Sequence, residues 1–385
     1  MEKAALAPPE DHYQGDETGD PVDFFDFTRK AKELNADFVQ LATLEAYSPA
    51  RDIIEVMMRW YEDADGNFIE QFQTTGFDQR IWELYLFAAF TEMGYELDRS
   101  VPVPDFLCST LDGSFAVEAM TVGPTRRSGS VVTPPPLTTP ENIENFRRHY
   151  MPIKFGSALF SKLQKAYWNR PNVKGKPFLF AVEDFSSPAS LTYSRSAFEH
   201  YVFGYEHDWY FDDHGRLLIT PQKIETHSWG GKVIPSGFFN QPDSQNVSAV
   251  LFSNSGTIAK FNRMGILSGF GSKRVLLIRE GTCVDHDPNA AAPKAFRHVV
   301  NARDYSETWT EGLDVFHNPR ALIPLHPDLV TGAAHHFLQE DGKMVSFTPE
   351  WHPLASFTKH YAPVDVRSEL QRMTAANSEL SHATE

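Results

Sequence analysis

Asp105 and Glu118 are the two residues whose types and spacing best suit a chemical role. They lie in a segment, residues 101–122, that alternates like two short strands around Asp112-Gly113, a common hairpin turn. Two carboxylates that share a Mg²⁺ or Mn²⁺ ion can help to activate water for phosphodiester hydrolysis, provided that a cation lies near the developing charge. The pair is therefore a candidate metal site.

The length of the turn decides whether these two acids can meet. With a two-residue turn, Leu111 pairs with Ser114, and Asp105 lies opposite Met120 and diagonal to Glu118. Diagonal neighbours have Cβ atoms roughly 7 Å apart, close enough for both to reach one ion with oxygen ligands about 2.1 to 2.4 Å from it. A three-residue loop would place the acids on opposite faces of the sheet. Taken singly, each acid is more simply explained as an exposed strand carboxylate.

Glu83 is a third acidic candidate because of its apolar surroundings. It is the only charged residue between Arg80 and Glu92, in a helix expected over 79–93 and closed by Gly94. A carboxylate there is costly to bury unless a partner or a metal neutralises it. A metal-linked role and an ion pair with Arg80, three residues away, explain Glu83 equally well.

In order and setting, these acids resemble the PD-(D/E)xK nuclease superfamily. In that superfamily a helix bearing a Glu precedes a hairpin written as Pro-Asp, a spacer and Glu-x-Lys. This chain reads WELYLFAAFTEMGY, VPVPDF and FAVEAM, so Glu83, Pro104-Asp105 and Glu118 match over about residues 75–185, under a third of the chain. The resemblance implies that Asp105, Glu118 and the main-chain carbonyl of Ala119 hold Mg²⁺ or Mn²⁺. The resemblance also implies that Glu83 holds a second ion or a metal-bound water.

The family's lysine is missing, because Met120 stands two residues after Glu118. The superfamily tolerates a lysine moved onto the helix after the third strand, and here a helix is expected over 157–168. Lys162 lies beside the apolar stripe of that helix, nearer the sheet than Gln164 or Lys165. We therefore predict Lys162 as the replacement cation. A solvated lysine whose stem covers apolar surface is an equally simple explanation.

Charge is distributed unevenly along the chain. The net charge is −16, and residues 1–120 hold 8 Lys and Arg against 25 Asp and Glu, whereas residues 121–180 hold 10 against 2. A local basic segment beside an acidic site suits an enzyme that must hold phosphates, although a solvated loop and helix would also account for it. Six of its residues are predicted to border one cleft and bind nucleic acid: Arg126, Arg127, Arg147, Arg148, Lys154 and Lys165.

The length of the chain indicates two domains or one large decorated domain. We expect an α/β restriction-endonuclease-like core, with a mixed central sheet flanked by helices, a helical N-terminal extension and a β-rich C-terminal region. The expected parts are a disordered lead-in (1–22), a helical extension (23–69), a nuclease-like core (70–280) with a flexible loop (123–141), a C-terminal region of unknown role (281–365) and a polar tail (366–385).

The two cysteines, Cys108 and Cys283, make no disulfide framework, and the N-terminal segment contains no long apolar run. A cytoplasmic protein without a signal peptide or membrane span is expected.

These residues predict a metal-dependent nuclease; the resemblance implies DNA, in preference to RNA, as its default substrate, and a role in defence against foreign DNA would suit it. Two alternatives remain open. One is a catalytically inactive module on the same fold that binds nucleic acid or protein, having lost its lysine at Met120. The other is an unrelated enzyme whose site lies in the second half, which is rich in Gly, Ser and Asn.

Overall fold

The structure is a computed structural model and describes residues 24–27, 33–61, 66–98, 100–127 and 130–363. The expected lead-in (1–22) and polar tail (366–385) lie outside the described residues. Within these ranges, no helix has the length and apolar character needed to cross a bilayer.

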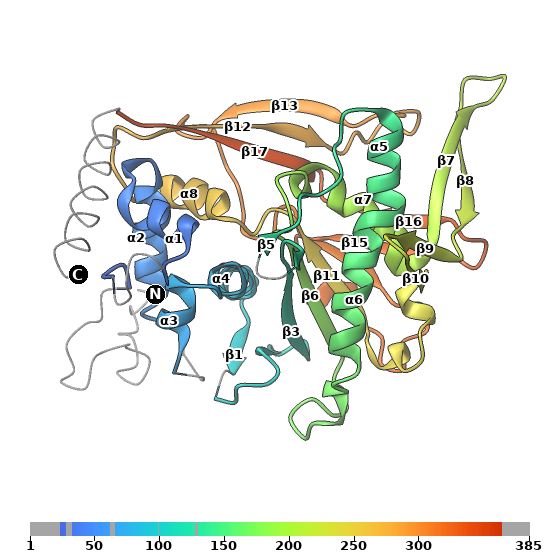
Figure 1. Cartoon of the computed structure of the whole chain (residues 1–385), viewed down its shortest axis with the longest axis horizontal. Helices are drawn as coiled ribbons and strands as arrows, with labels where there is room; N and C mark the ends of the chain where they lie inside the picture. Colours follow the sequence, from blue (N-terminus) through green and yellow to red (C-terminus); the bar gives the residue numbers. More distant parts are fainter. Residues whose placement is uncertain (1–23, 28–32, 62–65, 99, 128–129, 364–385) are drawn as a thin grey trace.

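An eight-stranded mixed sheet forms the centre of the molecule (Figure 1). Its antiparallel part β1–β2–β3 leads into the parallel neighbours β3, β6 and β11, so the expected α/β class with a mixed sheet is confirmed. In spatial order the strands are β1 (Glu96–Asp98), β2 (Phe106–Ser109), β3 (Ser114–Val122), β6 (Phe178–Asp184), β11 (Ala249–Ser253), β14 (Asp314–His317), β15 (Ala334–Leu338) and β16 (Met344–Phe347).

Helices cover both faces of this sheet. Helix α4 (Phe77–Glu92) packs on one face, and α6 (Met151–Leu163) and α7 (Ser190–Phe203) pack on the other, as Figure 1 shows. Residues of β3 alternate between these layers, because successive side chains of a strand point to opposite faces. Ala119 belongs to the α4 side, whereas Met120 belongs to the α6 side. Strand β6 is buried along its whole length, as expected for a central parallel strand.

The segment expected to be helical, residues 23–69, contains α1 (Ala36–Thr43), α2 (Ser48–Met57) and the start of α3 (Phe68–Gln73). These helices share one apolar core with α4. Helix α2 also packs closely on α8 (Ile258–Leu267). The Asn262 side chain donates to the Ala46 carbonyl at 2.7 Å and accepts from the Ala50 amide at 2.9 Å. A Cβ atom on Gly265 would lie 2.2 Å from the Pro49 carbonyl oxygen, so this contact requires glycine.

The C-terminal third does not form a separate region. Strands β14 to β16 extend the central sheet, because β14 pairs with β11. The boundary expected at 280/281 falls inside β12 (Leu276–Cys283), which pairs with β13 (Lys294–Val299) and β17 (Pro353–Tyr361) in a second sheet. The expected core and C-terminal region are therefore joined through both sheets.

The proline-rich loop expected over 123–141 contains regular structure. Strands β4 (Arg126–Arg127) and β5 (Ser130–Val131) pair in a short hairpin. Helix α5 (Pro140–Asn145) starts at the end of the loop, where the Thr139 hydroxyl accepts from the Asn142 amide. A short two-strand ladder and a helix that starts at a proline are both compatible with a segment this rich in proline.

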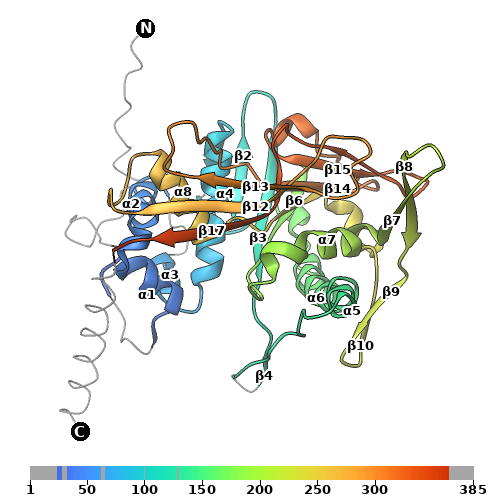
Figure 2. The same ribbon diagram turned by 90° about the horizontal axis from the view of Figure 1, so that it is seen from above.

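The helix expected over 157–168 starts earlier and ends earlier. A continuous helical stretch runs from α5 through a π-helical turn (Phe146–Tyr150) into α6, which ends at Leu163. Ala166 has a positive φ of 47°, so Tyr167 belongs to a separate 3-10 turn. Two further hairpins extend from the body in Figure 2: β7 (Tyr205–Phe211) with β8 (Leu217–Lys223), and β9 (Thr226–Trp229) with β10 (Lys232–Pro235).

Candidate active site

The hairpin that carries the two predicted acids has a four-residue loop. Ser109 pairs with Ser114, and the Thr110 amide donates to the Gly113 carbonyl at 2.9 Å. The expected two-residue turn was therefore wrong. The observed register differs from the expected one by two residues, an even number, so the acids still share a face. If this strand pairing is continued by one residue beyond Phe106, Asp105 lies directly opposite Glu118.

Asp105 immediately precedes β2, at the point where this strand separates from β3. Its Oδ2 accepts a hydrogen bond from the Ala119 amide at 2.7 Å, so the carboxylate replaces a strand partner for that amide. Burial, followed by the charges of Glu118 and Glu83, raises the pKa of Asp105 well above its usual range. Lys162 acts in the opposite direction. The predicted residues are thus close enough to influence one carboxyl group.

Glu118 is buried on β3 and faces α6. Its Oε1 accepts from the Lys162 ammonium at 2.6 Å and from the Tyr167 hydroxyl at 2.7 Å. The same ammonium lies 3.3 Å from the Ala119 carbonyl oxygen. Glu118 Oε2 is buried and has no hydrogen-bond partner among the described residues. The predicted lysine therefore reaches the predicted glutamate, and one glutamate oxygen remains for a further ligand.

Tyr167 is a site residue that the sequence did not reveal as one. It was expected only as part of an apolar helix stripe, yet its hydroxyl donates to Glu118. Burial and the neighbouring Glu118 carboxylate raise the pKa of Tyr167, so it stays a hydrogen-bond donor. A buried tyrosine usually requires a partner for its hydroxyl, which is the available sequence signal.

Glu83 lies on α4, on the other face of the sheet, and protein donors occupy both of its oxygens. Oε2 accepts from Arg80 at 2.7 Å and from the Tyr61 hydroxyl at 3.0 Å, and Oε1 accepts from the Gln79 amide at 3.0 Å. The ion pair with Arg80, one of the two explanations for this residue, is present. Its charge still reaches Asp105, where it raises the pKa.

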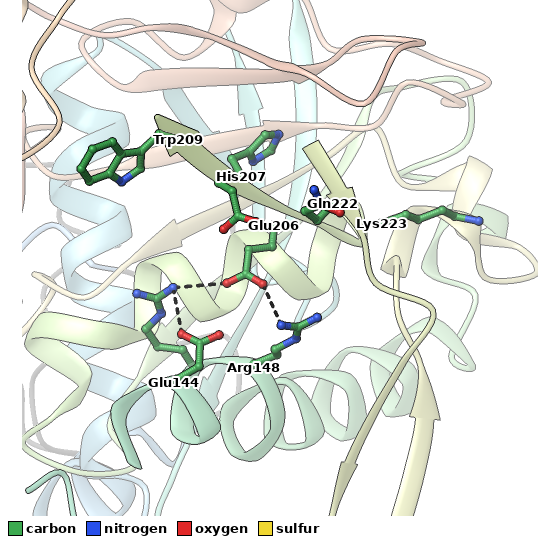
Figure 3. Close-up of a pocket in the computed structure, with 9 residues that line it drawn as sticks. Glu144, Arg148, Glu206, His207, Trp209, Gln222 and Lys223 are labelled. Atoms are coloured by element: carbon green, nitrogen blue, oxygen red, sulfur yellow. Dashed lines mark ion pairs between the residues drawn. The ribbon is translucent and has the colours of Figure 1, made fainter. Parts of the chain in front are cut away.

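Arg147 and Arg148 line a cavity of about 570 Å³. Arg126, Lys154 and Lys165, among the predicted basic residues whose side chains the structure describes, do not line this cavity. Glu206 of β7 forms ion pairs with both arginines, at 3.6 Å from Arg147 and 3.3 Å from Arg148. Figure 3 shows Glu206 beside Arg148. Glu144 forms a second ion pair with Arg147, also at 3.6 Å. The arginine pair (Arg147 and Arg148) is therefore already in contact with carboxylates.

The remaining basic residues lie elsewhere. Lys154 donates to the Gly123 carbonyl and the Thr125 hydroxyl, both at 2.9 Å, and so fastens the loop after β3 to α6. Arg126 and Lys165 are exposed, and the Arg127 side chain lies outside what the structure describes.

The arginine pair and the predicted active-site lysine lie far apart on the same helical stretch. Arg148 and Lys162 are 14 residues apart, which is roughly 21 Å at the helical rise of 1.5 Å per residue. The arginine pair is therefore well separated from Lys162, and the shared cleft stays a prediction.

The candidate site offers a metal two carboxylates and one main-chain carbonyl. In the described part of the chain, no three or more His, Cys, Asp or Glu side chains are grouped so that they could hold a metal ion. No family model, no curated protein and no solved structure matches this chain.

Proposed function

We propose that this protein is a metal-dependent nuclease, related in fold to the restriction endonucleases, that hydrolyses phosphodiester bonds of DNA. The observation that carries the proposal is the position of Lys162, whose ammonium lies 2.6 Å from Glu118 Oε1. Met120, which stands where the family's lysine belongs, is buried in the apolar layer beneath α6. A cation from α6 thus takes the place that Met120 cannot fill.

The order of elements supports the same proposal. Helix α4 carries Glu83, the β2–β3 hairpin carries Glu118 and is preceded by Asp105, and α6 carries Lys162 before the parallel strand β6. This succession is the one that the resemblance implies. Fold alone does not imply function, so the proposal depends on the site residues.

The residues present suit a hard divalent cation. Asp105, Glu118 and the Ala119 carbonyl would hold Mg²⁺ or Mn²⁺, since these ions prefer oxygen ligands. Two observations support the fit: the pKa of Asp105 is raised partly by Glu118, as expected for acids that share a site, and Glu118 Oε2 has no partner among the described residues. When bound, such an ion lowers the pKa of a water ligand and polarises the phosphate.

The protein groups around these ligands have separate tasks. Lys162 provides positive charge close to the carboxylates, where it would stabilise the charge that develops on the phosphate. The Tyr167 hydroxyl, together with Lys162, fixes Oε1 of Glu118 and thereby sets the orientation of Oε2. Tyr167 is therefore a positioning residue.

Cleavage assays test the proposal directly. Purified protein with Mg²⁺ or Mn²⁺ should cut DNA, and Asp105→Ala or Glu118→Gln should abolish cutting. Asp112→Ala is a matched control, because Asp112 is an exposed acid in the loop of the same hairpin. Cutting that survives both active-site substitutions would refute the assignment. RNA tested in parallel decides between the two substrates.

A non-catalytic module that binds nucleic acid or protein is the second candidate. The observation in its favour is that protein donors already hold Glu83 and Oε1 of Glu118, which leaves few oxygens for ions. Binding of DNA without cleavage in either metal, with a binding strength that Asp105→Ala does not change, would favour this candidate.

A further inference from the structure

A second cavity, of about 560 Å³, lies at the β12–β13–β17 sheet. Figure 1 shows β12 and β13 at the top of the molecule, away from the C-terminal end of α6 where Lys162 lies. The side chains that matter here are Arg279, Arg297, His298, Tyr305, Glu307 and Trp351. This cavity is separate from both the candidate active site and the arginine pair.

A buried charge network lies next to this cavity. Three cations of the described chain, Lys260, Arg263 and Arg279, share two carboxylates, Glu307 and Glu311. Glu307 accepts from Lys260 at 2.6 Å and from Arg263 Nε at 2.8 Å, and Glu311 accepts from Arg279 at 2.5 Å. Buried charges of this kind are costly unless each finds a partner.

Two further carboxylates lie near this network. Glu92 accepts from the Thr310 amide at 3.2 Å, and the charges of Lys260 and Glu307 both act on its pKa, so it belongs to the same electrostatic group. Asp304 lines the present cavity but is exposed, so water screens its charge.

Arg279 offers an unused hydrogen-bond donor in this setting. Its Nε donates to Ser356 at 2.9 Å, and its Nη1 contacts Glu311 and also lies 3.2 Å from the Tyr305 hydroxyl. Its Nη2 is buried without a hydrogen-bond partner among the described residues. Guanidinium groups bind phosphate oxygens well. Arg297, also on the cavity wall, is mostly exposed, and its ion pair among the described residues is a long one of 3.9 Å to Glu280, so it can provide a second guanidinium.

Aromatic rings form another part of the cavity wall. The rings of His298 and Trp351 are stacked, with centroids 5.2 Å apart and an interplanar angle of 30°. Phe296 packs edge-on against Trp351 at 5.0 Å, and Tyr305 packs edge-on against His298 at 6.0 Å. Aromatic side chains of this kind provide stacking surfaces for nucleobases.

We propose that this cavity binds a nucleotide, with its phosphate on Arg279 and Arg297 and its base against Trp351 and His298. The cavity volume lies within the range of roughly 300 to 1,000 Å³ that is typical of small-molecule sites. The nucleotide is either a free mononucleotide or part of a nucleic-acid strand, since both present the same chemistry. This site goes beyond the proposed nuclease activity and does not depend on it.

Calorimetry with the full chain tests the ligand class. AMP should bind at least about tenfold more tightly than adenosine or inorganic phosphate, because only AMP engages both walls. A 5′-phosphorylated oligonucleotide that displaces AMP identifies a strand as the source, and AMP binding without such displacement identifies a free nucleotide. No saturable binding of AMP, or equal binding of the aromatic carboxylate indole-3-acetate, would overturn the proposal.

Variants test the location. Arg297→Gln should weaken the binding of AMP at least about fivefold but not that of adenosine, and Trp351→Leu should weaken both about 5- to 100-fold. Arg303→Gln is the matched control, because Arg303 is exposed nearby and does not line the cavity. Wild-type affinity for AMP in both cavity variants would place the ligand elsewhere and refute the site.

Two more variants complete the test. Arg279→Lys keeps the buried charge but removes Nη2, so binding of AMP should fall at least about tenfold. If that variant does not fold, the Arg297 and Trp351 variants still decide the question. Asp105→Asn should bind AMP like the wild type, which separates this proposal from the fate of the nuclease proposal.

Discussion

The Lys162 ammonium and the Glu118 carboxylate meet at 2.6 Å although 44 residues separate them in the sequence. The meeting is possible because α6 runs antiparallel to β3. Lys154, near the start of α6, contacts Gly123 after the end of β3, and Lys162, near the end of α6, contacts Glu118 in the middle of the strand. Helix α6 thus places the Lys162 ammonium beside β3, which has Met120 where a lysine would be expected.

Replacing Lys162 with methionine should lower the rate of DNA cleavage on the order of 10² or more, because a positioned charge is lost. The buried Glu118 carboxylate also loses its cation, so the fold should lose stability, although the Tyr167 hydroxyl still donates to Glu118. Single-turnover cleavage with Mn²⁺ and circular dichroism measure these effects. Lys165→Met is the control, since Lys165 is an exposed lysine just after the same helix. Near-wild-type turnover in Lys162→Met would remove Lys162 from the mechanism.

Asp105→Asn should stabilise the protein at neutral pH in the absence of divalent cations. Burial and the charges of Glu118 and Glu83 raise the pKa of Asp105, so the folded state holds this proton more tightly than the unfolded state. The wild type therefore loses stability above the unfolded pKa of about 3.9, by about 1.4 kcal/mol for each pH unit, until the pH passes the folded pKa. Thermal melts of both proteins from about pH 4 to pH 8 measure the difference.

The gap in melting temperature between Asp105→Asn and the wild type should shrink towards about pH 4, where the carboxyl is protonated in the folded state and largely so in the unfolded state. Asp112→Asn, in the loop of the same hairpin, should show no such trend. A variant that is less stable than the wild type at neutral pH would show that the carboxylate stabilises the fold instead.

Arg80→Ala should destabilise the protein by about 3 to 5 kcal/mol, because it leaves the buried Glu83 carboxylate without its cation. Arg80 lies 2.7 Å from Glu83, and both side chains are almost fully buried. Urea denaturation measures the change. Arg59, exposed after α2, provides a control whose removal should cost within about 0.5 kcal/mol. Equal, small losses in the two variants would show that Glu83 does not need Arg80.

Glu206→Gln should tighten DNA binding at low salt if the arginine pair contacts phosphates. The substitution removes the carboxylate that lies between Arg147 and Arg148. The slope of log affinity against log salt should then steepen by about one unit for each arginine that gains a phosphate. Glu225→Gln, an exposed acid paired with Lys223, is the control. An unchanged slope would mean that the arginine pair makes no phosphate contact.

Local patterns predicted several elements because their signals are short-range. The apolar run before Gly94 predicted α4, and Gly94 has the positive φ of 85° that a helix end of this type requires. The apolar run at 177–185, PFLFAVEDF, likewise indicates a strand, and β6 lies within it. The face shared by Asp105 and Glu118 could be predicted although the turn length was wrong, because side-chain direction depends only on whether the register changes by an even or odd number.

Long-range features were not predictable in this way. The end of α6 depends on Ala166, a non-glycine residue with positive φ, which no propensity indicates. The pairing of β14 with β11 joins residues more than 60 positions apart, and strand pairing depends on tertiary context more than on local sequence. The contact of Glu206 with the arginine pair likewise crosses from one hairpin to another element.

The packing of α2 against α8 has a consequence for biosynthesis. The Asn262 side chain accepts a hydrogen bond from the Ala50 amide, which lies 212 residues earlier in the sequence. At translation rates of about 5 to 20 residues per second, the N-terminal helices wait roughly 10 to 40 s on the ribosome before α8 is made. During that interval the apolar side of α2 lacks its native cover. Newly made chains of this protein are therefore most exposed to aggregation, and most dependent on chaperones, before residue 270 has emerged.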